Sequence, residues 1–143
     1  MNTYKRDIGF YPLDVGRGND PGLANKFPNN PETGEILSPA GSRCNPVNWH
    51  DIVQQNWKGP YIAAWPDRTS WDGEYDYNLW PDGALRYGQS VLPGIYLGIQ
   101  RSRSDAAETA IPADVEADLV VRGIDADSGV NGESQLFLSS VTC

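Results

Sequence analysis

Turn-forming residues fill the stretch from Leu13 to Pro46, and no other feature limits the possible folds of this chain as strongly. The stretch contains the runs GRGNDPG, FPNNPETGE and SPAGSRCNP, and few of its apolar residues are spaced periodically. Gly, Pro, Asn and Asp favour turns because of their backbone conformations and their short hydrogen-bonding side chains. We therefore predict a long surface loop over residues 13–46, in a loop-rich domain with short regular elements.

Length and charge narrow the class of protein. A chain of 143 residues suits about one domain. We predict a single domain over residues 1–143, with the end of an N-terminal helix at 1–12, the loop at 13–46 and a sheet region at 47–143. The net charge of −8 repels nucleic acid and anionic lipid. No apolar stretch has the length of a membrane helix and no secretory leader opens the chain, so we expect a soluble molecule that binds no nucleic acid.

Three segments have the pattern of short helices. "NTYKRDIGFYP" is typical of the last turns of a helix, with Gly9 as the stop. "NWHDIVQQNW" places apolar residues on one helical face after Asn48, which is a candidate N-cap. "IPADVEADLVVRG" begins at Pro112 and stops at Gly123. We expect the apolar residues of this last helix to face a sheet: Val115, Leu119 and Val120.

Aromatic and β-branched residues mark the strands. "YDYNLW" and "GIYLGIQRS" are separated by "PDGALRYG", which contains an Asp-Gly turn signal, so they predict an antiparallel pair. "QLFLSSVTC" alternates apolar and polar residues and predicts a closing strand. The resulting fold class is α+β, with an antiparallel β-sheet, short helices and long loops.

Cys44 and Cys143 are the two cysteines of the chain, and they lack the spacing of a zinc site. A disulfide between them is the economical interpretation and implies an oxidising compartment, whereas the alternative is two unrelated thiols in a cytosolic protein. In the chain-entropy model, a bridge that closes a loop of about a hundred residues stabilises the fold by on the order of 4 kcal/mol.

All five Trp lie between residues 49 and 80, and the segment NWKGPYIAAWPDRTSWDGEYDY (residues 56–77) is the richest in aromatic residues. Exposed rings of this kind stack on sugars or peptides and form a binding surface. Buried rings instead anchor a small loop-rich domain, with their polar tips reaching water. We favour packing as the role of this segment.

The segment DADSGVNGES concentrates oxygen-bearing side chains close to the C-terminus. Carboxylate and hydroxyl oxygens are the ligands that calcium prefers, but the spacing does not match an EF-hand loop. An acidic turn is also readily solvated, so ordinary turn chemistry stays open beside a Ca²⁺ site. The candidate ligands are Asp125, Asp127, Ser128, Asn131 and Glu133.

No pattern of catalytic residues stands out. His50 is followed by Asp51, but neighbours in sequence do not face each other on a helix. Neither a GxSxG nucleophile motif nor a phosphate-binding loop is present. We therefore expect no catalytic residue and no enzyme activity.

Taken in order, the segments TYKRDIGFYP, NWKGPYIAAWP and SWDGEYDYNLW resemble the globular part of type IV pilin-like proteins, above all the major pseudopilins of type II secretion. In that family a long N-terminal helix ends in Tyr-x-x-Asp-x-Gly-x-Tyr-Pro, and a Trp-x-Gly-Pro-Tyr segment follows. A Trp-Gly-x-x-Tyr-x-Tyr segment then opens the sheet, and this chain matches it loosely. The matching residues are Tyr4, Asp7, Gly9, Tyr11, Pro12, Trp57, Gly59, Pro60, Tyr61, Trp71, Gly73, Tyr75 and Tyr77.

The resemblance implies a pilin-like globular domain that serves as a structural subunit of a type IV pilus or a type II secretion pseudopilus. It implies a periplasmic or extracellular location, with other pilin or pseudopilin subunits as partners. The apolar N-terminal helix of the family would precede this sequence or be supplied by a separate short helical pilin. That helix would be the one link to the membrane. The calcium loop of the pseudopilins is not matched residue by residue.

Two other classes of function stay open. A secreted carbohydrate- or surface-binding module would use a Trp platform and a calcium-stabilised loop. A hydrolase would need a close pair of carboxylates inside an aromatic cleft.

Overall fold

The computed structural model describes residues 1–39, 44–66, 68–86, 89–102, 109–127 and 129–141. The elements in chain order are α1 (Asn2–Ile8), α2 (Trp49–Asn56), β1 (Glu74–Trp80), β2 (Leu85–Arg86), β3 (Gln89–Ser90), β4 (Gly94–Gln100), α3 (Ala113–Val121) and β5 (Ser134–Ser140). An antiparallel sheet has the strand order β1-β4-β5, and β2 pairs with β3 in a separate ribbon. The predicted α+β class is confirmed, as is the antiparallel pairing of the two aromatic strands.

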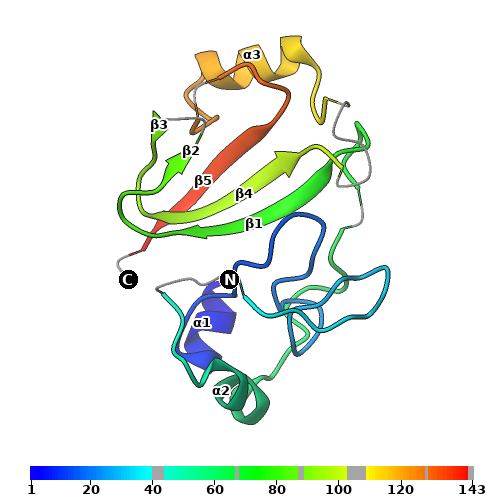
Figure 1. The fold of residues 1–143 in the computed structure, drawn as a ribbon, viewed down its shortest axis with the longest axis vertical. Helices are drawn as coiled ribbons and strands as arrows, with labels where there is room; N and C mark the ends of the chain where they lie inside the picture. Colours follow the sequence, from blue (N-terminus) through cyan, green and yellow to red (C-terminus); the bar gives the residue numbers. More distant parts are fainter. Residues whose placement is uncertain (40–43, 67, 87–88, 103–108, 128, 142–143) are drawn as a thin grey trace.

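The helices lie on opposite sides of the sheet. Figure 1 shows α1, α2 and the blue and cyan loop below the sheet, and α3 above it. α1 ends where predicted, because Gly9 adopts a left-handed φ of 97° and its N–H donates to the Lys5 carbonyl at 2.7 Å. α2 also forms where predicted, and Asn48 is its N-cap residue, although the Asn48 side chain makes no capping hydrogen bond.

The segment from 13 to 46 contains no helix and no strand of the sheet among its described residues, as predicted. It is not confined to the surface, however, because Leu13, Asp20 and Leu23 are buried. Its organising group is the buried carboxylate of Asp20, which accepts four backbone N–H groups in succession. These belong to Gly22, Leu23, Ala24 and Asn25, at 2.7–3.1 Å. One side chain thereby satisfies the polar backbone of a whole turn.

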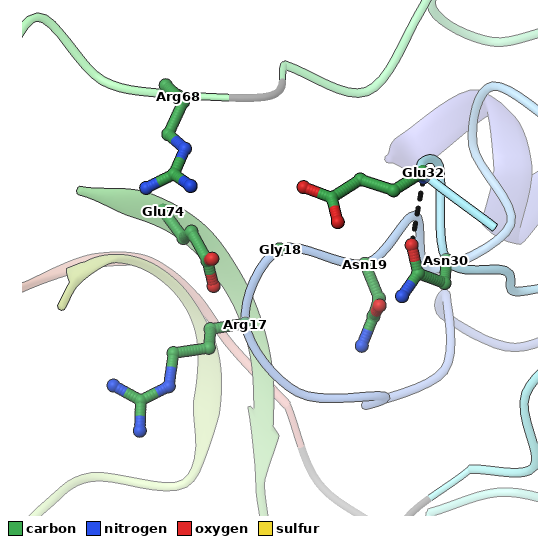
Figure 2. Close-up of a pocket in the computed structure, with 7 residues that line it drawn as sticks. All are labelled: Arg17, Gly18, Asn19, Asn30, Glu32, Arg68 and Glu74. Carbon is green, nitrogen blue, oxygen red and sulfur yellow. Dashed lines mark hydrogen bonds between the residues drawn. The ribbon is translucent and has the colours of Figure 1, made fainter. Parts of the chain in front are cut away.

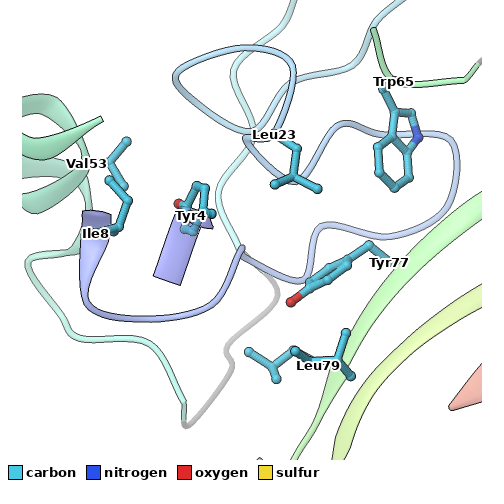
Figure 3. Packing of buried hydrophobic residues seen from close by; sticks show 8 residues of the cluster. Tyr4, Ile8, Leu23, Val53, Trp65, Tyr77 and Leu79 are labelled. Carbon is cyan, nitrogen blue, oxygen red and sulfur yellow. The ribbon is translucent and has the colours of Figure 1, made fainter. Parts of the chain in front are cut away.

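The lower face of the sheet is apolar. Alternate residues of β1 and β4 point to it, and Tyr77, Leu79 and Ile95 are each at most 2% exposed. They pack with Tyr4 of α1 and with other buried side chains into one cluster, which Figure 3 shows between the helices and the sheet. The other members of this cluster are Ile8, Leu23, Val53 and Trp65.

The upper face of the sheet is mixed: the rings of Trp80, Tyr96 and Phe137 contact one another at one end, and a buried polar group lies beside them. Asp76 and Asn78 of β1 and Gln135 of β5 are at most 7% exposed. Asn78 Nδ2 donates to Asp76 Oδ2 at 3.0 Å and to Gln135 Oε1 at 3.2 Å. The Gln135 side chain lies directly over Gly98 of β4, where a Cβ would approach its Nε2 to 2.7 Å. The glycine therefore makes room for a bridge of hydrogen bonds across the three strands.

α3 does not bury an apolar face as predicted. Its one fully buried residue is Glu116, at 0% exposure, whereas Val115, Leu119 and Val120 are half-buried. The Glu116 carboxylate accepts the backbone N–H groups of Asn131 and Gly132 at 2.7 and 2.9 Å. Hydrogen bonds from the loop before β5 compensate the burial of this charge, which explains the departure from an amphipathic pattern.

Candidate functional site

Residues of the segments TYKRDIGFYP and NWKGPYIAAWP lie against each other. The Tyr4 and Tyr61 rings meet edge to face at 5.2 Å, and Tyr61 Oη donates to Asp7 Oδ2 at 3.2 Å. Burial raises the pKa of the Tyr4 hydroxyl, and the neighbouring Tyr61 adds to the shift. α1 is thereby fixed to the segment that follows α2 by both an aromatic contact and a hydrogen bond.

Trp57, Gly59 and Pro60 shape the second segment. The Gly59–Pro60 peptide bond is cis, and the Trp57 ring lies so close to Gly59 that a Cβ there would clash with it. Trp57 Nε1 donates to the Gly22 carbonyl at 3.2 Å, and Tyr61 N–H donates to the Leu23 carbonyl at 2.8 Å. The segment therefore connects α1 to the 13–46 loop.

The third segment is only partly joined to this junction. Tyr77 is buried in the apolar cluster and Tyr75 packs against it. Gly73 lies close to the Gln100 carbonyl, where a Cβ would approach to 2.9 Å. Trp71 is 40% exposed, while the other four Trp are buried or half-buried. This distribution agrees with packing as the main role of the aromatic residues.

Beside the start of α1, the apolar face of the sheet is left partly uncovered. A groove of about 390 Å³ opens there, with Met1 at its edge and sheet residues from all three strands along it. The residues that line it are Met1, Leu23, Ile62, Trp65, Pro66, Tyr75, Tyr77, Leu97 and Leu138. All are apolar or aromatic, so the groove is suited to another apolar surface.

The predicted calcium ligands fall into two groups. Asp125, Asp127 and Asn131 are adjacent: the Asp127 N–H donates to Asp125 Oδ1 at 3.4 Å, and Asn131 Nδ2 donates to Asp127 Oδ1 at 3.3 Å. Glu133 is directed elsewhere, because its Oε1 accepts from Arg17 Nη1 at 3.5 Å and from Arg101 Nε at 3.4 Å. Ser128 lies outside the described residues.

Two oxygens of this acidic loop stand out. Asp125 Oδ2 and Asp127 Oδ2 are buried and have no hydrogen-bond partner in the described part of the chain. Burial raises the pKa of Asp125, and the nearby charges of Asp127 and Glu116 raise it further, against hydrogen bonds from Gln135 and Asp127 that lower it. A hard cation is the natural partner of such oxygens. Among the residues that the structure describes, however, no group of three or more Asp, Glu, His or Cys side chains is arranged to hold a metal ion.

A small polar pocket of about 90 Å³ lies between the 13–46 loop and the start of β1. Figure 2 shows Arg17 and Arg68 near Glu74, with Glu32 on the opposite wall. Arg68 donates to the Asp72 carbonyl at 2.9 Å, and Glu74 accepts from Ser102 at 3.2 Å. The two positive and two negative side chains balance each other, so the pocket has no excess charge to attract an ion.

The predicted disulfide stays a prediction, because Cys143 is outside the described residues. Cys44 is half-buried against the apolar cluster, and no cysteine in the described ranges is free. Val141 lines the same small pocket as Cys44, so the strand that leads to Cys143 passes close to Cys44.

Sequence reasoning missed Glu116 and Gln135, two buried polar residues that organise the upper side of the sheet. Gly98 was the available signal for Gln135, because a glycine inside a strand often marks a close approach. The groove residues Leu97 and Leu138 were also missed as a surface, since strand periodicity does not show where a covering element ends.

Comparison of the chain with protein-family models, with curated proteins and with solved structures found no match. No helix formed by the described residues is long and apolar enough to cross a membrane.

Proposed function

We propose that this chain is a pilin-like structural subunit of a periplasmic or extracellular filament, a type IV pilus or a type II secretion pseudopilus. It acts by assembly, without catalysis. The observation that carries the proposal is the apolar groove beside the N-terminus of α1. We propose that the apolar face of a helix occupies this groove.

The position of Met1 supports a helix as the occupant. Met1 precedes α1 and lines the groove itself, so a helix that leads into α1, or one that lies beside its start, meets the groove first. The groove is long enough to touch β1, β4 and β5 through Tyr75, Leu97 and Leu138. An apolar helix face in an apolar groove is a recurrent mode of recognition in which burial supplies the affinity.

The junction of the two pilin-like segments supports the same proposal. Four residues that match the sequence patterns of the family are joined by contacts in the structure: Tyr4, Asp7, Trp57 and Tyr61. Their contacts fix α1 against the segment that follows α2, and a subunit that stacks through a helix needs such a fixed helix. A repeated contact between different surfaces of successive subunits does not close and produces a fibre.

The test replaces one groove residue by a charge. Leu138→Lys puts an ammonium at the rim of the groove, on a side chain that is already 39% exposed. We expect it to abolish filaments, seen by electron microscopy, in cells that express the gene in its native context. Leu85→Lys is the matched control, since Leu85 is 70% exposed and does not line the groove.

Normal filaments with Leu138→Lys, in a variant that melts at the wild-type temperature, would contradict the proposal. Sequencing upstream of residue 2 and the neighbouring genes distinguishes the two sources of the helix. An in-frame apolar segment of about twenty residues would mean that the helix belongs to the same polypeptide. A separate gene for a short helical protein would mean that a partner chain supplies the helix.

A further inference from the structure

We propose that Asn131 is a latent deamidation site and that Glu116 of α3 keeps it closed. The inference concerns the loop before β5 and is independent of the proposed filament function. It follows from the sequence Asn131–Gly132 and from the hydrogen bonds around it.

Asn followed by Gly is the dipeptide in which this reaction meets the least steric hindrance. The backbone nitrogen of the glycine attacks the side-chain carbonyl carbon of the asparagine. An N–C bond forms, the amide nitrogen leaves as ammonia with the proton released from the backbone N–H, and a cyclic imide results. Water then opens the imide to aspartate or isoaspartate, so no oxidant or cofactor is needed.

The N–H of the attacking nitrogen is engaged by Glu116 in this structure. The Gly132 N–H donates to both oxygens of Glu116, at 3.1 Å to Oε1 and 2.9 Å to Oε2, and the Asn131 N–H donates to Oε1 at 2.7 Å. Glu116 is 0% exposed. Hydrogen bonds to a charged acceptor shielded from water are the strong ones, so the nitrogen is free to attack only when this contact opens.

The target side chain is held as well. Asn131 Nδ2 donates to Asp127 Oδ1 at 3.3 Å, and Asn131 Oδ1 accepts the Glu133 N–H at 3.0 Å. Both the nucleophile and the amide are therefore engaged by other groups. Among the described residues, Glu116 is the side chain that binds the nucleophile, which makes it the positioning residue of this clamp.

Deamidation at this place has structural consequences. A carboxylate at position 131 would stand beside Asp127, which is already buried and whose Oδ2 has no hydrogen-bond partner among the described residues. Isoaspartate would also lengthen the backbone just before Ser134, the first residue of β5. Both changes would loosen the loop from α3, because like charges repel and the bonds to Glu116 depend on backbone spacing.

The test follows deamidation of the folded protein over time by mass spectrometry and isoaspartate detection. Glu116→Gln keeps the size of the side chain but removes its charge, and we expect it to raise the rate at Asn131 about tenfold, the effect of weakening a hydrogen bond to a charged acceptor. Asp118→Asn is the matched control, since it removes a charge from the same helix at a side chain that is 55% exposed. We expect its rate to equal that of the wild type.

A folded Glu116→Gln variant that deamidates at the wild-type rate would overturn the proposal. A slower rate would also overturn it, because Glu116 would then act as a base that assists the reaction. If the variant does not fold, hydrogen exchange in the wild-type protein decides. Slow exchange at the Gly132 amide relative to Gly83, which lies in the turn before β2, supports the clamp, and equal exchange refutes it.

Discussion

Each face of the central sheet contributes buried side chains, but the two sets are held together by different interactions. The lower face packs Tyr77, Leu79 and Ile95 against α1 and the loop. The upper face carries Asp76, Asn78 and Gln135, which are as well covered but joined by hydrogen bonds. Alternation along the strands separates the two sets, since successive side chains point to opposite faces.

This difference shows how a small loop-rich domain divides its tasks. The apolar face supplies stability in proportion to the area removed from water, and it tolerates changes that keep shape and volume. The polar face supplies less net stability but demands an exact match of donors and acceptors, because an unpaired buried polar group is costly. We therefore expect stability to fall when side-chain volume is removed from the lower face. On the upper face, we expect it to fall when hydrogen-bond geometry is disturbed or the pH is changed.

The largest effect is expected from truncation on the apolar face. Ile95 is 1% exposed, and Ile95→Ala should lower the free energy of unfolding by about 3 kcal/mol through lost burial and a residual cavity. Chemical denaturation measures this loss. A loss below about 1 kcal/mol would mean that the apolar face is not the main source of stability.

On the polar face, Gly98→Ala tests geometry. The new methyl group would displace Gln135 from Asn78, so we expect a loss of about 1 kcal/mol, the typical value of such a hydrogen bond. In a Gln135→Ala background the same change should be neutral or stabilising. The methyl group then fills the space that Gln135 vacated, and alanine lowers the conformational entropy of the unfolded chain. Equal losses in both backgrounds, measured as a double-mutant cycle, would show that Gly98 does not act through Gln135.

The acidic loop should respond to pH in a defined direction. The raised pKa of Asp125 means that its folded carboxyl holds a proton more tightly than the unfolded one. The ionised Asp125 carboxylate therefore destabilises the folded protein. This effect is absent below the unfolded pKa, grows as the pH rises towards and through the folded pKa, and is complete above it. With a chelator present, the stability of Asp125→Asn relative to wild type should rise from acidic to neutral pH. Asp82→Asn, at an exposed turn, measures the effect of removing an ordinary surface charge, and parallel pH profiles for the two variants would contradict the assignment.

The smallest effect is expected from calcium. Asp125 and Asp127 offer two oxygens without hydrogen-bond partners among the described residues, fewer than the six to eight that calcium takes. Millimolar calcium should therefore raise the melting temperature only slightly, and Asp127→Asn should remove the rise. If calcium does not raise the melting temperature of the wild-type protein, the loop does not bind calcium.

The sequence predicted the lower side of the fold well. The stop of α1 at Gly9, the position of α2, the long loop and the antiparallel strands all follow from local signals in turn residues and alternation. The contact of Tyr61 with Asp7 was not predicted, since no local signal joins residues 54 positions apart.

The upper side could not be predicted in the same way. Asp76 and Asn78 alternate with Tyr75 and Tyr77, and such alternation normally indicates a strand with one face in water. Only the fold reveals that these side chains are buried. The same limit explains Glu116, because a charged residue on a short helix is expected to face solvent unless its partners are known.

Asp20 has a consequence for engineering. Because its carboxylate fixes the turn at residues 22–25, the outer part of the loop around Asn30 to Gly34 carries little of the structure, and its residues 32–36 are exposed. Foreign peptides inserted there would be displayed on a rigid base. If the chain assembles as proposed, a fibre would repeat such a peptide at every subunit, which would make the loop a grafting site for multivalent display.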